Sequence, residues 1–327
     1  MKPIILGIFA AFFFAFTFVL NHAMELSGGS WIWSASLRYI FMVPFLLIIV
    51  VARRNLRPLL KAMKEQPKTW LLWSFIGFGL FYAPLCFASA YSPGWLIAAT
   101  WQITLISGML LGPLFLETIQ TKNGIVQTQG KIPLKGLSLS FIILLGIILI
   151  QLEQASTISV STLILGIIPV VVASFAYPLG NRKMMDVCQN RLDAYQRVLG
   201  MTLASLPFWL LLSIYGLFTV GVPSKEQTIQ SVLVAVTSGV IATVLFFHAT
   251  DLVRGNMQKL GAVEATQSME VLFTLLGEVI FLSIALPSNL SWVGIVVVVF
   301  GMVLHSFASH SKKDTKAISS SDKSITH

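Results

Sequence analysis

Two glutamates in one long apolar stretch are the residues best placed to do chemistry. Glu270 and Glu278 lie in the stretch 262–285, and Gln267 lies one turn before Glu270. An ionised side chain in hydrocarbon costs about 2.5 to 3.5 kcal/mol, so a carboxyl group there normally faces a cavity or a partner. Eight residues apart, the two glutamates differ by about 80° around a helix, so one face presents both. We expect this face to bind a cationic group or to carry a proton.

A structural alternative is that each buried charge is paired and only fixes packing. Arg38 is the expected partner of Glu278, because both lie about seven residues from the outer face, at ~1.5 Å rise per residue. Glu264 is expected at the membrane interface. Arg38 and Arg197 occupy mirrored positions, where they either gate the two entrances by exchanging partners or extend to the lipid headgroups.

Trp101 and Gln102 place an aromatic ring beside an amide about two turns into another apolar stretch. Such a pair suits an organic cation held against the ring face, although tryptophans near that depth also belong to interfacial belts. Weaker candidates are Tyr82, Tyr177 and His248. Asn21 and Asn181 close their predicted helices, where capping and ligand contact explain them equally well.

The elements that carry these residues are membrane-spanning helices. Of the 327 residues, 56% are apolar and 11% are charged, whereas soluble domains carry about 25% charged residues. Backbone groups in lipid must be satisfied within their own segment, which predicts helices. The predicted fold is all-α and integral to the membrane, with ten transmembrane helices at 3–21, 31–51, 70–89, 95–116, 136–151, 161–179, 197–218, 230–250, 262–285 and 291–309.

The positions of Lys and Arg predict the orientation of these helices. With the N-terminus inside, 20 of the 22 basic residues fall on the cytoplasmic side, as the positive-inside rule requires for an even helix count. Only Lys225 lies in an outer loop. We therefore expect a multi-pass protein of the cell membrane with both termini in the cytoplasm, and the net charge of +9 does not indicate nucleic-acid binding.

Short motifs recur in the same order in both halves of the chain. Phe14-Ala15-Phe16 corresponds to Phe175-Ala176-Tyr177, and Ala35-x-x-Arg38-x-x-x-Met42 corresponds to Ala194-x-x-Arg197-x-x-x-Met201. Ala99-Thr100 and Ala265-Thr266 are a third match. A five-helix unit that repeats must be inverted in the membrane, an architecture typical of transporters. The predicted units are 1–155 and 156–310, followed by a disordered cytoplasmic tail at 311–327.

These motifs resemble the drug/metabolite transporter superfamily, within it the multidrug-resistance efflux branch. The resemblance rests on Phe-Ala-Tyr-Pro-Leu-Gly-Asn-Arg at 175–182, the Arg38 and Arg197 pair, the run 268–278 and the closing run 292–302. It covers all ten predicted helices and implies two five-helix repeats. Small four-helix relatives exchange protons for cationic drugs through a glutamate in their first helix. The first and sixth helices here have no central carboxylate, so that mechanism does not transfer.

The function predicted from these features is secondary active export of a small organic compound, drug-like cation or metabolite, by alternating access. Protons are one candidate coupling ion, and no cofactor, metal or nucleic acid is expected. Phosphate-binding loops, metal-ligand clusters and nucleophile elbows are not found in the sequence, so an enzyme is not expected. Alternatives are an amino-acid or nucleotide-related metabolite exchanger, a membrane sensor, or a lipid-modifying enzyme. Substrate and oligomeric state are not predicted.

Overall fold

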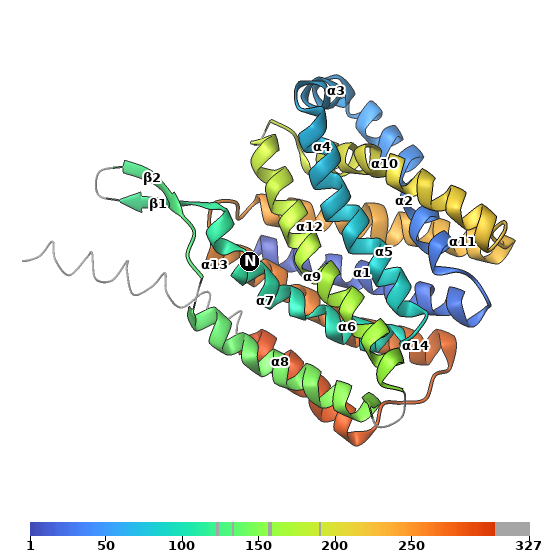
Figure 1. Ribbon diagram of the computed structural model, residues 1–327. Helices are drawn as coiled ribbons and strands as arrows, with labels where there is room; N and C mark the ends of the chain where they lie inside the picture. The colour runs from blue at the N-terminus through green and yellow to red at the C-terminus, as the bar shows by residue number, and fades with distance from the viewer. Residues whose placement is uncertain (122–123, 133, 156–158, 190, 305–327) are drawn as a thin grey trace, which may run out of the picture.

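Apolar helices packed side by side make up almost the whole molecule (Figure 1). The computed structural model describes residues 1–121, 124–132, 134–155, 159–189 and 191–304. Seven helices there are long and apolar enough to cross a membrane: Lys2–Leu26 (α1), Trp31–Ala52 (α2), Pro67–Ser89, Val160–Cys188 (α9), Ala194–Thr219 (α10), Lys225–Asp251 and Lys259–Leu282. Shorter apolar helices are Gly94–Leu110, Gly136–Ile150 and Asn289–Leu304.

Several of these helices are composed of shorter segments. The segments are α4 (Pro67–Ser74), η1 (Phe75–Gly79), α5 (Leu80–Ser89), α6 (Gly94–Trp101), α7 (Ile103–Leu110), α11 (Lys225–Val234), η3 (Ala235–Ala242), α12 (Thr243–Asp251), α13 (Met257–Ala265), η4 (Thr266–Ser268) and α14 (Met269–Leu282). The helix α8 (Leu134–Ala155) is continuous and contains Gly136–Ile150. Each predicted range falls on one of the apolar helices. Most of the helices extend further than predicted, because polar residues at their ends still satisfy the helical hydrogen-bond ladder outside the hydrocarbon.

Two elements were not expected from the sequence. The first is α3 (Leu56–Glu65), a short helix that buries Leu59 and exposes Arg57, Lys61 and Lys64. The second is an antiparallel hairpin of β1 (Leu116–Thr121) and β2 (Gly124–Gln129), which pairs Leu116 with Gln129. The predicted helix 95–116 is therefore wrong at its end. The helix stops at Leu110 because Pro113 follows, and the chain passes through a 3₁₀ turn at Gly112–Leu114 into the hairpin.

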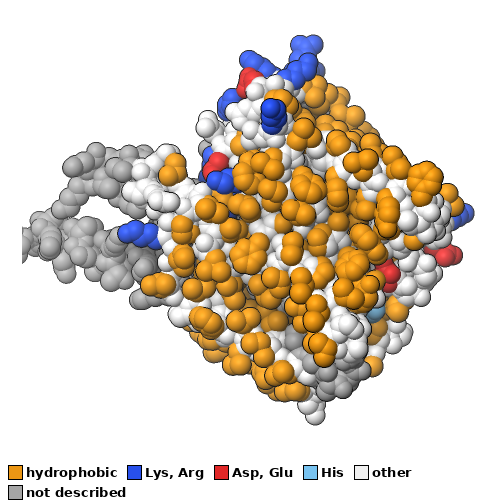
Figure 2. Space-filling view, viewed as in Figure 1, with side chains coloured by type: hydrophobic (Ala, Val, Ile, Leu, Met, Phe, Trp, Pro, Cys, Tyr) orange, Lys and Arg blue, Asp and Glu red, His pale blue; other side chains and the backbone are white. Residues whose placement is uncertain are grey.

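The outer surface of the bundle is apolar and its basic residues are gathered at one end. In Figure 2, hydrophobic side chains cover the face between the two ends of the bundle, and most Lys and Arg side chains lie toward the end with α3 and the hairpin. Large side chains such as Ile48, Phe141 and Phe281 are more than 60% exposed. A surface so rich in apolar groups is expected where lipid is the solvent, and the molecule is accordingly a multi-pass membrane protein.

Two spans contain π-helical segments. These are η1 in the span Pro67–Ser89 and η3 in the span Lys225–Asp251. At η1 the backbone of Gly77 lies against Gly180 of α9, so closely that a Cβ atom at Gly180 would overlap the Gly77 backbone. Segments of π-helix are frequent at functional sites, and both of these face the interior of the bundle.

The predicted tail 311–327 and the end of the predicted helix 291–309 beyond residue 304 lie outside the described residues, as does the predicted start of the second unit at residue 156.

Candidate functional site

Two interrupted helices meet at the centre of the bundle. The helix Gly94–Leu110 breaks at Gln102, whose backbone N–H donates to the carbonyl of Ala99 at 3.1 Å. The second helix tightens into the 3₁₀ segment η4 between α13 and α14. The Gln102 side-chain amide donates to the backbone oxygens of Ala98 at 2.9 Å and of Gln267 at 3.4 Å. The two interruptions are thereby joined.

A small cavity adjoins these interruptions. Its lining residues come from both halves of the chain and are Phe14, Thr17, Phe18, Phe81, Leu85, Trp101, Tyr177, Gln267 and Glu270. The centre of a water-sized sphere can occupy about 10 Å³ of this cavity. That volume is about the minimum for one ordered water molecule. The cavity therefore has little room beyond one water molecule, and a larger ligand requires the helices to separate.

Glu270 is the charged group of this cavity. Its side chain is 1% exposed, and its Oε1 atom has no hydrogen-bond partner among the described residues. The surrounding side chains are largely aromatic or aliphatic, an environment in which an unpaired carboxylate is costly. Glu270 can relieve that cost by binding either a proton or a cationic group.

Aromatic rings form the wall beside Glu270. The ring centroid of Tyr177 lies 4.5 Å from that of Phe81, 5.8 Å from that of Trp101 and 5.8 Å from that of Phe246. Phe81 and Trp101 are 5.2 Å apart. Ring faces of this kind attract organic cations. The arrangement fits the predicted use of Trp101, whose side chain is buried rather than interfacial.

Glu278 does not pair with Arg38, and this prediction was wrong. Its carboxylate accepts the backbone N–H groups of Gly94 at 2.9 Å and Trp95 at 3.0 Å, and it contacts His22 Nδ1 at 2.5 Å. A carboxylate is stabilised at a helix N-terminus, here that of α6. Depth alone suggested Arg38, whereas the free N–H groups of α6 lie closer. Glu278 is therefore a cap for α6, away from the cavity.

Glu264 is buried in an ion pair with Arg182. Both of its oxygens accept hydrogen bonds from Arg182 Nη2, at 2.8 and 2.7 Å, and Oε1 also accepts from Nε at 3.2 Å. The two side chains are only 6% and 4% exposed. Arg182 Nη1 also donates to the carbonyl of Gly108 at 2.5 Å. Burial of Glu264 is tolerated because this guanidinium neutralises it.

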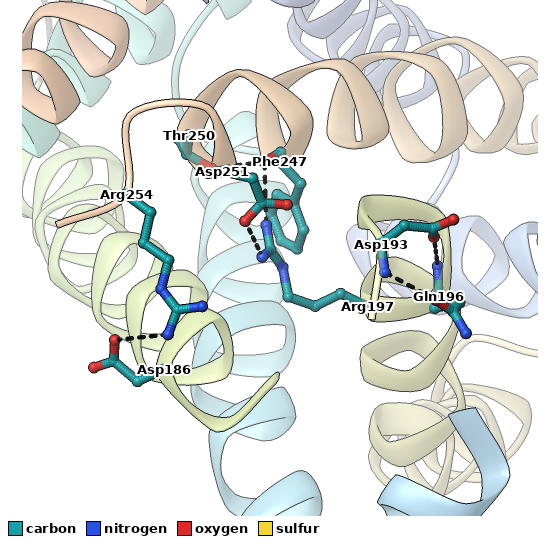
Figure 3. A network of polar contacts seen from close by, with 8 residues as sticks. All are labelled: Asp186, Asp193, Gln196, Arg197, Phe247, Thr250, Asp251 and Arg254. Carbon is teal, nitrogen blue, oxygen red and sulfur yellow. Dashed lines mark hydrogen bonds and ion pairs between the residues drawn. The ribbon is translucent and has the colours of Figure 1, made fainter. Parts of the chain in front are cut away.

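A polar vestibule opens on the far side of that ion pair. It is a depression of about 620 Å³, and Arg182, Asp186, Asp251 and Arg254 are among its lining residues. Figure 3 shows Asp186 paired with Arg254, at 3.8 Å, and Asp251 with Arg197, at 2.5 Å. Arg197 is 1% exposed, so it is held by Asp251 and does not extend to the headgroups.

The remaining candidates are dispersed. Asn21 and Asn181 lie inside α1 and α9 rather than at helix ends, so capping does not explain them. Asn21 donates to Tyr82 Oη and Cys86 Sγ, both at 3.3 Å. His248 is exposed on α12. Tyr82 packs against the guanidinium of Arg38 at 3.9 Å.

Four of the predicted candidates share the cavity: Glu270, Gln267, Trp101 and Tyr177. The Gln102 side chain donates a hydrogen bond to the backbone carbonyl of Gln267, one of the lining residues. Glu278 and Arg38 are not among the lining residues. Sequence reasoning missed Thr17 and Phe81, since a lone threonine or phenylalanine has no distinctive spacing in an apolar run. Arg182 ends the motif 175–182 that carries the family resemblance, but it was not predicted as a site residue.

Interrupted helices around a buried, unpaired carboxyl in a multi-pass bundle are typical of membrane transporters. The family model described as "EmrE: Putative multidrug resistance efflux transporter" matches residues 1–311. The chain belongs to this family and thus to the drug/metabolite transporter superfamily, which confirms the resemblance found in the sequence.

Three similar proteins match most of this chain. "Uncharacterized protein YjlA" of Bacillus subtilis (strain 168) is 58% identical over 316 residues, which are 97% of this chain and 98% of that protein. A Shouchella clausii protein, "Uncharacterized 42.1 kDa protein in intracellular alkaline protease 3'region", is 48% identical over 83% of this chain and 70% of its own. A solved structure described as "Crystal structure of protein" is 12% identical with a TM-score of 0.66, covering 95% of this chain and 98% of its own. That likeness concerns the fold alone.

Proposed function

We propose that the protein is a secondary transporter that exports a small organic compound by alternating access. The observation that carries the proposal is the unpaired carboxyl of Glu270 in an aromatic cavity between two interrupted helices. In this role Glu270 binds a proton in one half of the cycle and a cationic group of the substrate in the other. Trp101 and Tyr177 contact the substrate, and Gln267 orients it.

The proposed transport cycle uses ten spans arranged as two inverted five-helix units, 1–155 and 156–310. The packing supports this arrangement. Helix α1 packs against α12 and α14 of the second unit, and α9, its counterpart, packs against α5 and α7 of the first. The counterparts α2 and α10 pack against each other, and π-segments occur in the matching third and eighth spans. Two such units can open alternately toward either side of the membrane.

The inner gate of this cycle is proposed to be the ion pair between Arg182 and Glu264. Glu264 of α13, Gln267 of η4 and Glu270 of α14 are spaced three residues apart, and side chains with this spacing are neighbours on one helix face. A compound leaving the vestibule would therefore meet Glu264, then Gln267, then Glu270. The bidentate pair closes this route in the state seen here.

Both termini and the vestibule are proposed to face the cytoplasm. This orientation is supported by the Lys and Arg side chains, most of which gather toward the end of the bundle with α3 and the hairpin (Figure 2), because basic residues favour the cytoplasmic side. Export from the cell membrane would then begin at the vestibule, driven by the proton gradient.

Transport in proteoliposomes tests the proposal. Purified protein is reconstituted with an inward or outward pH gradient, and uptake of labelled aromatic cations is measured for the unmodified protein, for Glu270→Gln and for the exposed control Glu226→Gln. We expect uptake that depends on the gradient, loss of it in Glu270→Gln, and no change in Glu226→Gln. Flux that ignores the gradient and persists in Glu270→Gln would refute the role of Glu270 in coupling. Lipid turnover in detergent without any flux would instead identify an enzyme.

A further inference from the structure

The guanidinium of Arg38 is buried without a carboxylate. Its side chain is 1% exposed, and its Nη2 atom donates to Ser238 Oγ at 3.1 Å. The carbon at its centre lies 3.9 Å from the ring centroid of Tyr82. Among the residues that the structure describes, Nε and Nη1 have no hydrogen-bond partner and no acidic side chain forms an ion pair with Arg38. A buried cation in this state has unused capacity for an anion.

Arg197, the counterpart of Arg38 in the repeat motif, shows what is missing. It lies 4.5 Å from the ring centroid of Phe247, and its Nη1 atom contacts Asp251, four residues after that ring (Figure 3). Arg38 is stacked in the same manner on Tyr82, but the residue four positions after that ring is Cys86. The same local arrangement therefore holds a carboxylate at one arginine and a neutral thiol at the other.

Arg38 is connected to the cavity that contains Glu270. Ser238, which accepts a hydrogen bond from Arg38, is also hydrogen-bonded to Thr17. Thr17 lines the cavity together with Glu270. A row of two hydroxyl groups thus links the unpaired guanidinium to the wall of a cavity that also contains the unpaired carboxyl. An anionic group at Thr17 would be attracted by the positive charge of Arg38 at the other end of this row.

We propose that the substrate is zwitterionic, with its cationic group at Glu270 and its carboxylate or other anionic group at Thr17 and Arg38. This inference rests on the proposed transport function and specifies the class of compound transported. The two unpaired charges of the site are opposite in sign, so one zwitterion neutralises both at once. A simple cation would leave the guanidinium unpaired, and a simple anion would leave the carboxyl unpaired.

An inorganic anion is the other source of negative charge for Arg38. Chloride bound there as a co-ion would leave the organic substrate a plain cation. Transport of the same compound in chloride and in gluconate buffers separates the two cases, because a zwitterion supplies its own anionic group.

Competition in proteoliposomes provides the test. Zwitterionic aromatic amino acids are compared with their cationic methyl esters, using the unmodified protein, Arg38→Gln, Arg38→Lys and the exposed control Arg57→Gln. We expect the zwitterion to be transported and its half-saturating concentration to rise about tenfold or more in Arg38→Gln, the usual effect of losing a charge-assisted hydrogen bond. Arg38→Lys should recover part of this loss. Arg57→Gln should leave the half-saturating concentration of the zwitterion unchanged. The half-saturating concentrations of the esters should be the same for all four proteins.

The ester also serves as the folding control, since its transport by Arg38→Gln shows an intact protein. If esters are transported but the zwitterions are not, or if Arg38→Gln still transports both compounds and raises their half-saturating concentrations equally, the inference is overturned while the transport function stands. Chloride-dependent transport of cations overturns it in favour of an inorganic anion at Arg38. If Arg38→Gln transports neither compound, binding of the zwitterion to Arg38→Lys, measured by thermal stabilisation in detergent, decides: unchanged affinity overturns the inference, and weakened affinity supports it. If the unmodified protein transports none of the compounds offered, the proposed function itself fails for this class.

Discussion

The buried pair between Arg182 and Glu264 gives the sharpest prediction about stability. Both side chains are almost fully buried, at 4% and 6% exposure, and three N–H···O contacts of 2.7 to 3.2 Å join them. Removing one partner of such a pair leaves the other charge buried and unpaired, at a cost of about 3 to 5 kcal/mol. Replacing both by apolar groups of similar size removes that penalty. It leaves mainly the lost hydrogen bond to the Gly108 carbonyl, about 1 kcal/mol.

A double-mutant cycle measures this difference. We expect Arg182→Met and Glu264→Met each to lower the free energy of unfolding by about 3 to 5 kcal/mol, and the double variant to lower it by only about 1 kcal/mol. The assay is reversible unfolding in mixed detergent and dodecyl sulfate micelles, followed by tryptophan fluorescence.

The exposed pair of Arg191 and Glu65 is the matched control. Its atoms are 3.5 Å apart, and its side chains are 53% and 43% exposed. Exposed pairs contribute about 0 to 1 kcal/mol, so the same cycle there should give a coupling energy near zero. Equal coupling energies for the two pairs, or a double variant as unstable as the sum of its singles, would refute the reasoning.

Two further outcomes are expected. Glu278→Gln should lower the free energy of unfolding by about 2 to 4 kcal/mol, because the neutral amide loses the charge that accepts hydrogen bonds from the Gly94 and Trp95 N–H groups. Glu270→Gln should change the free energy of unfolding by less than about 1 kcal/mol. A larger effect of Glu270→Gln would show a structural role for Glu270. Trp101→Ala should raise the half-saturating concentration of an aromatic cation about tenfold through loss of a desolvated cation–π contact, while Trp292→Ala, 38% exposed on the lipid-facing surface, should not; both are read from proteoliposome uptake.

The apolar helices could be predicted from the sequence because lipid permits few alternatives. A backbone in hydrocarbon must satisfy its own hydrogen bonds, so apolar length alone predicts a helix. That argument fails where the chain leaves the hydrocarbon. The basic helix α3 and the hairpin after Gly112 were missed because outside the hydrocarbon the backbone can also hydrogen-bond to water. There, weak helix and strand propensities are easily overridden by tertiary contacts.

The candidate site was predicted in part for a similar reason. Glu270, Gln267, Trp101 and Tyr177 are polar or amphipathic groups deep in apolar stretches, where burial is costly enough to be conspicuous. Their presence in one cavity is a structural fact, and their roles in transport stay predictions. Partners were harder to predict. Glu278 was assigned to Arg38 by depth, but the choice between that guanidinium and the N–H groups of α6 depends on how α6, α14 and α1 meet.

The contact between Glu278 and the start of α6 has a mechanical consequence. The amides of Gly94 and Trp95 are anchored to α14, and the same carboxylate holds His22 of α1. One side chain therefore ties together three helices from both ends of the chain. When the bundle opens, we expect these three helices to move together as one rigid unit and to bend at the helix interruptions at Gln102 and η4. Slow hydrogen exchange at the first two amides of α6 in every ligand condition would be the signature of that rigid unit.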